Sequence, residues 1–201
     1  MKVNNSVALI APGAGVVLGV LDFVWIAYVP SPFGGLGNSI AVWAVAAFLL
    51  TLSSRWDLPR AVVAAVVFLI VAVPSYYVAA ALIQHDDWSI IYSGPALLWM
   101  GFGVIAGVVF GAGGVIARTP TRWQAPALAL PAAVLAAEAV LQLSRLGKST
   151  AGLGYAAVLL ILAVAVTLVV APSWRTRGLA LAYALPLTAV GYLMLLASGF
   201  R

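Results

Sequence analysis

The sequence predicts an all-α polytopic membrane protein, a bundle of seven transmembrane helices that forms a single integral membrane domain over residues 1–201. Two observations predict this class. Hydrophobic residues make up 65% of the 201 residues and charged residues only 7%, so no part of the chain is polar enough to form a separate soluble domain. The apolar residues also gather into long runs. Because a helix rises about 1.5 Å per residue, about 20 apolar residues cross the hydrocarbon core.

Seven such runs are expected to form helices. In chain order they cover residues 7–29, 36–53, 61–83, 95–117, 125–143, 152–171 and 178–199. The first run is interpreted as a helix rather than a signal peptide, because it is too long and lacks a small-x-small cleavage site. The second run is the weakest, since it is short and is entered through Gly34, Gly35 and Gly37. Six spans, with this segment re-entrant, are the alternative.

Small residues and prolines indicate how these helices pack. Glycines recur at four-residue spacing in the first and fourth runs, namely Gly15 and Gly19, and Gly103, Gly107 and Gly111. Such faces let helix backbones approach closely in lipid. Interior prolines at Pro74, Pro131 and Pro186 bend a helix. The first and fourth runs also share a Gly-x-Gly-Val pattern, which allows an inverted three-helix duplication.

The net charge of +5 is interpreted as membrane topology rather than nucleic-acid binding. With seven spans, one face carries Lys2, Arg55, Arg60, Arg118, Arg122, Arg175 and Arg177. The other face carries Arg145, Lys148 and Arg201, together with the acids Asp86 and Asp87. The positive-inside rule then predicts a multi-pass protein of the cytoplasmic membrane, with a cytoplasmic amino terminus and an external carboxyl terminus.

Two carboxylates, Asp22 and Glu138, lie inside the apolar runs. A charge in hydrocarbon costs roughly 3 kcal/mol or more, so an acid at this depth indicates a functional site. Both acids are expected in the outer half of the bundle, where aromatic residues lie deeper than an interfacial belt. We therefore predict one outward-facing cavity that is lined, besides the two acids, by Trp25, Trp43, Tyr76, Tyr77, Trp99, Gln142, Tyr155 and Tyr192. The alternative is that the acids only bond neighbouring helices and the rings belong to the core and the belt.

An acid that faces aromatic rings suits acid-initiated cyclisation, because the acid protonates an alkene or epoxide and the rings stabilise the carbocation. The favoured hypothesis is a membrane-integral terpene cyclase for a lipophilic isoprenoid-derived substrate. Asp22 is its leading proton donor and Glu138 its second acid or final base, with no metal and no cofactor. The first alternative is small-solute binding or transport, in which the acids hold a cation or an amine. The second is a non-catalytic membrane subunit.

Several other chemistries lack their residues. The chain has no cysteine and therefore no thiol chemistry. It has no Walker loop, no nucleophile elbow and no paired aspartate motif that would ionise a prenyl diphosphate. The last run contains no lysine, which excludes a retinal Schiff base. His85, Asp86 and Asp87 form one short polar run, and we expect no metal site there.

The stretch over residues 30–39, followed by Ala41, Val42 and Trp43, resembles small integral membrane proteins that are common in actinobacteria and are grouped as a domain of unknown function. That family lends no catalytic residues. In architecture the chain is also similar to the membrane-integral cyclases of meroterpenoid and indole-sesquiterpenoid pathways, which use intramembrane carboxylates as acids. A third likeness is to the substrate-binding subunits of vitamin importers, which have about six helices and an outward-facing site. The expected partners are a lipid bilayer and a lipophilic small-molecule substrate, and no nucleic acid.

Overall fold

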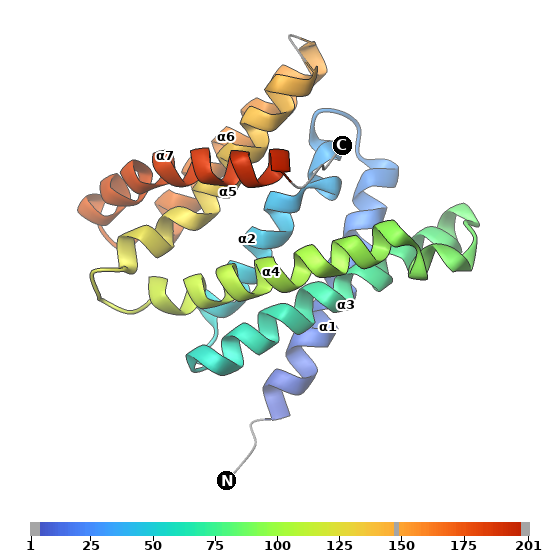
Figure 1. The fold of residues 1–201 in the computed structure, drawn as a ribbon, viewed down its shortest axis with the longest axis horizontal. Helices are drawn as coiled ribbons and strands as arrows, with labels where there is room; N and C mark the ends of the chain where they lie inside the picture. Colours follow the sequence, from blue (N-terminus) through green and yellow to red (C-terminus); the bar gives the residue numbers. More distant parts are fainter. Residues whose placement is uncertain (1–4, 147–148, 198–201) are drawn as a thin grey trace.

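The computed structural model describes residues 5–146 and 149–197, and the described chain is helical with no strand (Figure 1). Its α-helices are α1 (Asn5–Tyr28), α2 (Ile40–Ser53), α3 (Leu58–Gln84), α4 (Gly94–Ala117), α5 (Gln124–Leu146), α6 (Thr150–Val170) and α7 (Trp174–Ala197). Two short 3-10 helices, η1 (Phe33–Asn38) and η2 (Trp88–Tyr92), precede α2 and α4. The predicted all-α class is confirmed. Each α-helix begins within four residues of its predicted start.

Six of these helices are long and apolar enough to span a membrane, whereas α2 has only 14 residues. At about 1.5 Å per residue α2 is about 21 Å long, which is shorter than the hydrocarbon core. The sequence predicted a helix from residue 36, but residues 33–38 form η1 instead. The glycines explain this difference, because η1 folds back against α1. A Cβ atom on Gly37 would lie 2.7 Å from Ile26 Cγ1 and 2.8 Å from the Asp22 carbonyl oxygen.

The direction of the helices shows that η1 and α2 together carry the chain back through the bundle. Gly15 packs on the Phe68 carbonyl and Gly19 on the Ala72 carbonyl, so α1 and α3 run in the same direction. The chain between them must therefore return to the end at which α1 begins. The structure therefore follows the predicted path of seven alternating segments, in which six helices have spanning length and α2 is a shorter seventh. The re-entrant alternative, which would make α1 and α3 antiparallel, is wrong.

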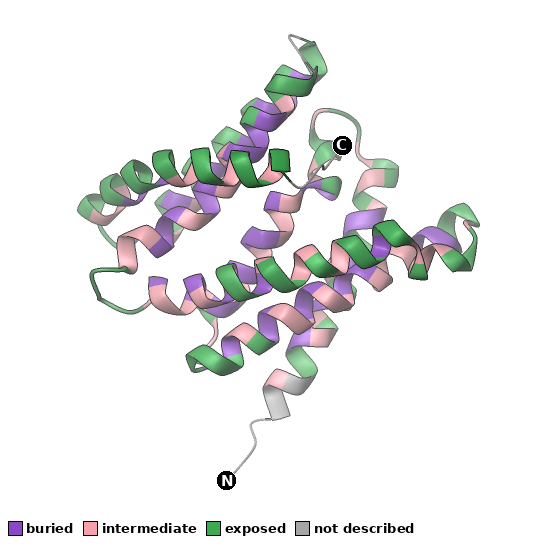
Figure 2. Ribbon diagram, viewed as in Figure 1, coloured by how far each residue is buried: buried purple, intermediate pink, exposed green. Residues whose placement is uncertain are grey.

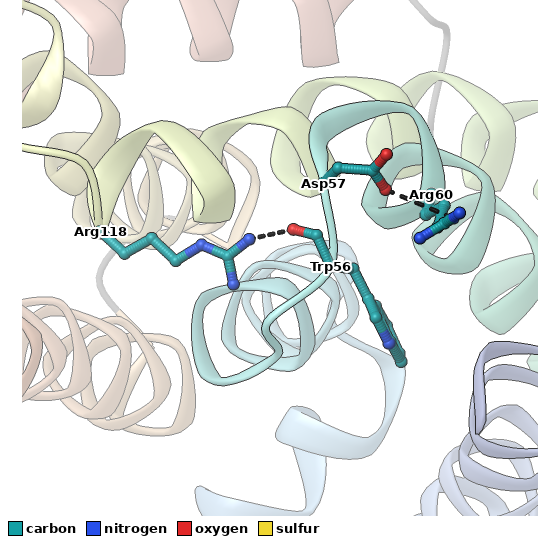
Figure 3. Close-up of polar contacts among 4 residues, drawn as sticks. All are labelled: Trp56, Asp57, Arg60 and Arg118. Carbon is teal, nitrogen blue, oxygen red and sulfur yellow. Dashed lines mark hydrogen bonds and ion pairs between the residues drawn. The ribbon is translucent and has the colours of Figure 1, made fainter. Parts of the chain in front are cut away.

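Contacts at the loops agree with this path. The Arg118 guanidinium, at the end of α4, donates to the backbone carbonyl of Trp56 and, at 3.4 Å, to that of Thr51. Figure 3 shows Arg118 reaching the Trp56 carbonyl beside the exposed ion pair of Asp57 and Arg60. The α2–α3 and α4–α5 connections therefore lie at the same end of the bundle.

The most extensive helix pairs are α1 with α3 and α5 with α7. In the second pair the Thr188 hydroxyl donates to the Ala133 carbonyl at 3.4 Å, and Gly191 lies against Ala137, so α5 and α7 are also parallel. An inverted duplication would instead need α4 and α6 to pair as α1 and α3 do. The described residues form no comparable α4–α6 pair. The helix contacts therefore do not support the inverted duplication that the glycine pattern allowed. The chain has two three-helix units of the same direction, joined by α4.

The predicted glycine faces pack helices together. Gly103, Gly107 and Gly111 of α4 meet Leu69, Val66 and Ala65 of α3 in turn, which makes α3 and α4 antiparallel. Figure 2 shows buried residues on the inward faces of α2, α3 and α5, whereas α7 is mostly exposed. Because the exposed side chains of α7 are largely apolar, this surface suits contact with lipid tails.

The charge asymmetry persists in three dimensions. Among the described residues one end carries Arg55, Arg60, Arg118, Arg122, Arg175 and Arg177, and the other carries Asp86, Asp87 and Arg145. Lys2, Lys148 and Arg201, which entered the predicted charge difference, lie outside the described residues. The guanidinium groups of Arg122 and Arg177 lie 5.3 and 4.5 Å from the rings of Trp123 and Trp174. Such pairs fit the headgroup level of a bilayer.

Candidate functional site

The tight packing of α1 on α3 determines where Asp22 lies. Gly19 has no side chain to separate it from the Ala72 carbonyl of α3, so the two helices stay close for a further turn. That turn brings Asp22 of α1 beside Tyr76 of α3. Asp22 lies six residues before the end of α1 at Tyr28, or about 9 Å along the helix axis. Asp22 is therefore in the half of the bundle that lies away from the arginine-rich end.

A pocket of about 140 Å³ opens at this place between α1, α2, α3 and α4. Its lining residues are Asp22, Asn38, Ser39, Trp43, Val73, Tyr76, Tyr77 and Trp99. Five of these were predicted from the sequence as site residues. The pocket combines the carboxyl group of Asp22, the amide of Asn38 and the hydroxyl of Ser39 with four aromatic side chains, of which two are tyrosines with hydroxyl groups of their own. None of these lining side chains is cationic.

Asp22 is the only carboxyl group in the pocket lining, and its side chain is only 8% exposed. Trp43 lies beside Asp22 in the pocket, and its indole N–H is placed to interact with the Asp22 carboxyl group. Because indole has only an N–H donor, Asp22 is the acceptor in this interaction. A carboxyl group has several acceptor positions, so it retains capacity for a ligand donor.

The aromatic residues form two groups across the pocket. On α3, Tyr76 meets Phe23 edge-to-face at 5.4 Å between ring centroids and Tyr77 at 5.3 Å. On the opposite side, Trp43 and Trp99 lie 6.2 Å apart. Ring pairs at these separations stabilise one another by about 0.5–1.5 kcal/mol beyond their buried area. The rings therefore hold one another in place around Asp22.

Glu138 lies outside this pocket, behind the first turn of α2. Its Oε2 atom accepts from the Ser39 hydroxyl at 2.9 Å and from the Ala41 backbone N–H at 2.8 Å. Its Oε1 atom accepts from the Tyr155 hydroxyl at 2.7 Å. The expected single cavity shared by both acids is therefore not what the structure has. Ser39 and the start of α2 stand between Glu138 and the pocket that contains Asp22.

The remaining predicted site residues lie outside the pocket lining. Tyr155 on α6 bonds Glu138 and has its ring against Gly35 of η1. Trp25 is 43% exposed, and its indole N–H donates to the Phe33 carbonyl at 2.8 Å, which ties η1 to α1. Gln142 is half-buried on α5, one turn beyond Glu138, and Tyr192 is half-buried on α7.

Asn38, Ser39 and Val73 line the pocket but were not predicted as site residues. A signal for Ser39 was present, because a serine just before an apolar run is typical of a helix N-cap. The Ser39 hydroxyl does accept from the Val42 N–H at 3.1 Å. No comparable sequence signal exists for Asn38, whose position depends on the fold of η1.

The polar residues at the end of α3 shape the connection between α3 and η2. His85 ends α3 in the left-handed conformation, with φ of 60°. The Asp87 carboxylate accepts from the Ser89 N–H at 2.7 Å and caps η2. This hydrogen bond lowers the pKa of Asp87. Within the described residues no three His, Cys, Asp or Glu side chains come together as a metal site.

The fold and the pocket define a multi-pass helical membrane protein with an intramembrane carboxyl group among aromatic rings. The chain belongs to the family of unknown function DUF6518, whose sequence profile matches residues 2–198. Comparison with curated proteins and with solved structures finds no match.

Proposed function

We propose that the pocket binds a small organic cation, an amine or a quaternary ammonium ion, for solute binding or transport across the cytoplasmic membrane. The observation that carries this proposal is the combination of Asp22 with the rings of Trp43, Tyr76, Tyr77 and Trp99 in one pocket. Aromatic faces attract cations, and a desolvated cation gains about 2 kcal/mol or more from one ring. A carboxylate within an apolar bundle is stabilised by a partner charge, and a bound cation supplies one.

The size of the pocket favours a small ligand over an isoprenoid. An apolar cavity of about 150 Å³ holds a molecule the size of benzene, and this pocket measures about 140 Å³. A fifteen-carbon substrate is much larger than benzene. The cyclase hypothesis also gave Glu138 a role at the substrate, and Glu138 lies behind Ser39 with its oxygens already hydrogen-bonded. Among the functions considered from the sequence, solute binding or transport therefore has the better support.

The architecture supports transport in particular. Many transporters combine repeated helical units with a broken helix whose irregular segment lies at the substrate site. Here α1–α3 and α5–α7 run in the same direction, and η1 interrupts the path into α2 at the pocket wall. With the arginine-rich end in the cytoplasm, the pocket lies toward the external side.

Calorimetry on the protein in lipid nanodiscs tests the proposal. The probes are tetramethylammonium and ethylammonium. The uncharged comparison is tert-butanol, whose size is similar to that of tetramethylammonium. We expect saturable binding of at least one cation, no binding of the alcohol, and a loss of affinity of at least tenfold in Asp22→Asn. The matched control is Asp57→Asn, which removes an exposed acid at the opposite end. Absence of cation binding, or equal affinity in Asp22→Asn, contradicts the proposal.

A further inference from the structure

Glu138 is separated from the pocket by a single residue, Ser39, which touches both. Ser39 lines the pocket, and its hydroxyl donates to Glu138 Oε2. The same carboxylate oxygen accepts from the Ala41 N–H, one of the N–H groups at the start of α2 that have no partner within the helix. Glu138 therefore contacts the first turn of α2 through both a side chain and the backbone.

That first turn carries two of the pocket residues. Ser39 is the N-cap of α2, and Trp43 follows one turn later. The backbone N–H of Trp43 donates to the Ser39 carbonyl at 3.3 Å. Trp43 lines the pocket with Asp22, places its indole N–H beside the carboxyl group, and packs its ring against that of Trp99. The position of the first turn of α2 thus determines how Ser39 and Trp43 are placed relative to Asp22.

The first turn of α2 is held from two directions. On one side it follows η1, which packs on α1 where Gly37 meets Ile26 and the Asp22 carbonyl, and α2 itself is only 14 residues long. Glu138 on α5 and Tyr155 on α6 hold it from the other three-helix unit, and Glu138 is only 5% exposed. A carboxylate near a helix N-terminus is stabilised by the helix dipole, and hydrogen bonds to a charged acceptor are stronger than neutral ones.

We infer that Glu138 is the positioning residue of the cation pocket: it anchors the first turn of α2 to α5 and α6, and so couples the pocket in the α1–α4 region to the second three-helix unit. This inference rests on the proposed cation site. Glu138 does not touch the ligand. It acts through Ser39 and Trp43, and Tyr155 orients its second oxygen.

Two measurements on the full chain in nanodiscs test this inference: the dissociation constant of tetramethylammonium, and amide hydrogen exchange in the first turn of α2. In Glu138→Leu we expect exchange to accelerate and the dissociation constant to rise at least tenfold. Glu138→Gln, which retains one acceptor oxygen, should fall between this variant and the wild type. Tyr155→Phe keeps the ring and removes one hydrogen bond, so it should fold and show a smaller change of the same sign.

The matched control is Thr167→Val, which removes a buried hydroxyl that bonds only the Ala163 carbonyl of its own helix, at 2.9 Å. It should change neither measurement. Unchanged exchange in Glu138→Leu overturns the inference, and so does faster exchange at an unchanged dissociation constant. If the wild type binds no cation, the proposed function fails. The exchange measurement is then still informative: faster exchange in Glu138→Leu shows that Glu138 anchors α2, and unchanged exchange shows that it does not.

Discussion

Gly19 of α1 lies directly against the backbone carbonyl of Ala72 in α3, with no space for a side chain between them. The same approach recurs one turn earlier, where Gly15 meets Phe68. Backbone contact of this kind stabilises helix pairs in lipid through van der Waals packing. The Gly19 contact also brings Asp22 beside Tyr76, so the packing of α1 on α3 and the geometry of the pocket depend on the same contact.

Gly19→Ala should therefore destabilise the protein, because the new methyl group meets the Ala72 carbonyl and the Tyr76 backbone nitrogen. Overpacking of this kind typically costs about 1–3 kcal/mol. The same substitution at Gly13 is the control, since a Cβ there has no atom within 4 Å. Thermal unfolding in nanodiscs should show a lower midpoint for Gly19→Ala and not for Gly13→Ala. Equal midpoints would show that α1 can shift away from α3 without loss.

Arg118 should stabilise the arginine-rich end. Its guanidinium group donates to the Trp56 carbonyl in the α2–α3 loop and, together with the Ser54 hydroxyl, to the Thr51 carbonyl at the end of α2. A hydrogen bond from a charged group contributes about 1.5–3 kcal/mol. Arg118→Ala is expected to lower the unfolding midpoint measurably. Arg122→Ala, which removes an exposed arginine of the same α4–α5 connection, is not expected to lower it. A midpoint for Arg118→Ala as high as that of Arg122→Ala would refute this role.

The topology can be tested with single cysteines, because the native chain has none. Ser89 in η2 and Thr121 in the α4–α5 connection are exposed and lie at opposite ends of α4. The positive-inside rule puts the end that carries Arg118 and Arg122 in the cytoplasm. A membrane-impermeant thiol reagent should label Ser89→Cys in intact cells and Thr121→Cys only after lysis. The reverse pattern would invert the proposed orientation and place the pocket on the cytoplasmic side.

The η2 loop should respond to acid through Asp87. Its folded-state pKa is lowered by the Ser89 N–H bond, so the carboxylate contributes stability above the unfolded pKa of about 3.9. That contribution is lost as the pH falls through the folded pKa. Amide exchange at Ser89 and Ile90, corrected for its intrinsic pH dependence, should lose protection in this range. Asp87→Asn, which caps without titrating, should show no such step, and a step retained in that variant would assign it to another group.

Hydropathy predicted the six long helices because each carries enough apolar residues to meet lipid on its own. The short length of α2 was harder to predict, since residues 36–39 are as compatible with a helix as with η1 until Gly37 is placed against α1. The acids show the same limit. Depth along the chain put Asp22 and Glu138 in the same half of the bundle, but which side of α2 each one faces depends on helix rotation and packing. That rotation leaves Asp22 in the pocket and Glu138 behind Ser39.

The aromatic side chains of the pocket give the most discriminating test of ligand charge. Tyr77 lines the pocket and meets Tyr76 edge-to-face. If the ligand is a cation held by ring faces, Tyr77→Phe should bind tetramethylammonium nearly as well as the wild type, because the ring remains. Tyr77→Leu fills similar space without a π face and should lose about 0.5–2 kcal/mol, which raises the dissociation constant about two- to thirty-fold.

The relative affinity of the two variants separates the ring from the hydroxyl group, because both substitutions remove the hydroxyl and only one removes the ring. Calorimetry with the wild type, Tyr77→Phe and Tyr77→Leu measures the difference, and thermal unfolding of each variant checks that the fold is kept. Weaker binding in Tyr77→Phe than in Tyr77→Leu would mean that the hydroxyl group, and not the ring, contacts the ligand. The pocket would then recognise a hydrogen-bonding solute, and the cation–π part of the proposal would be wrong.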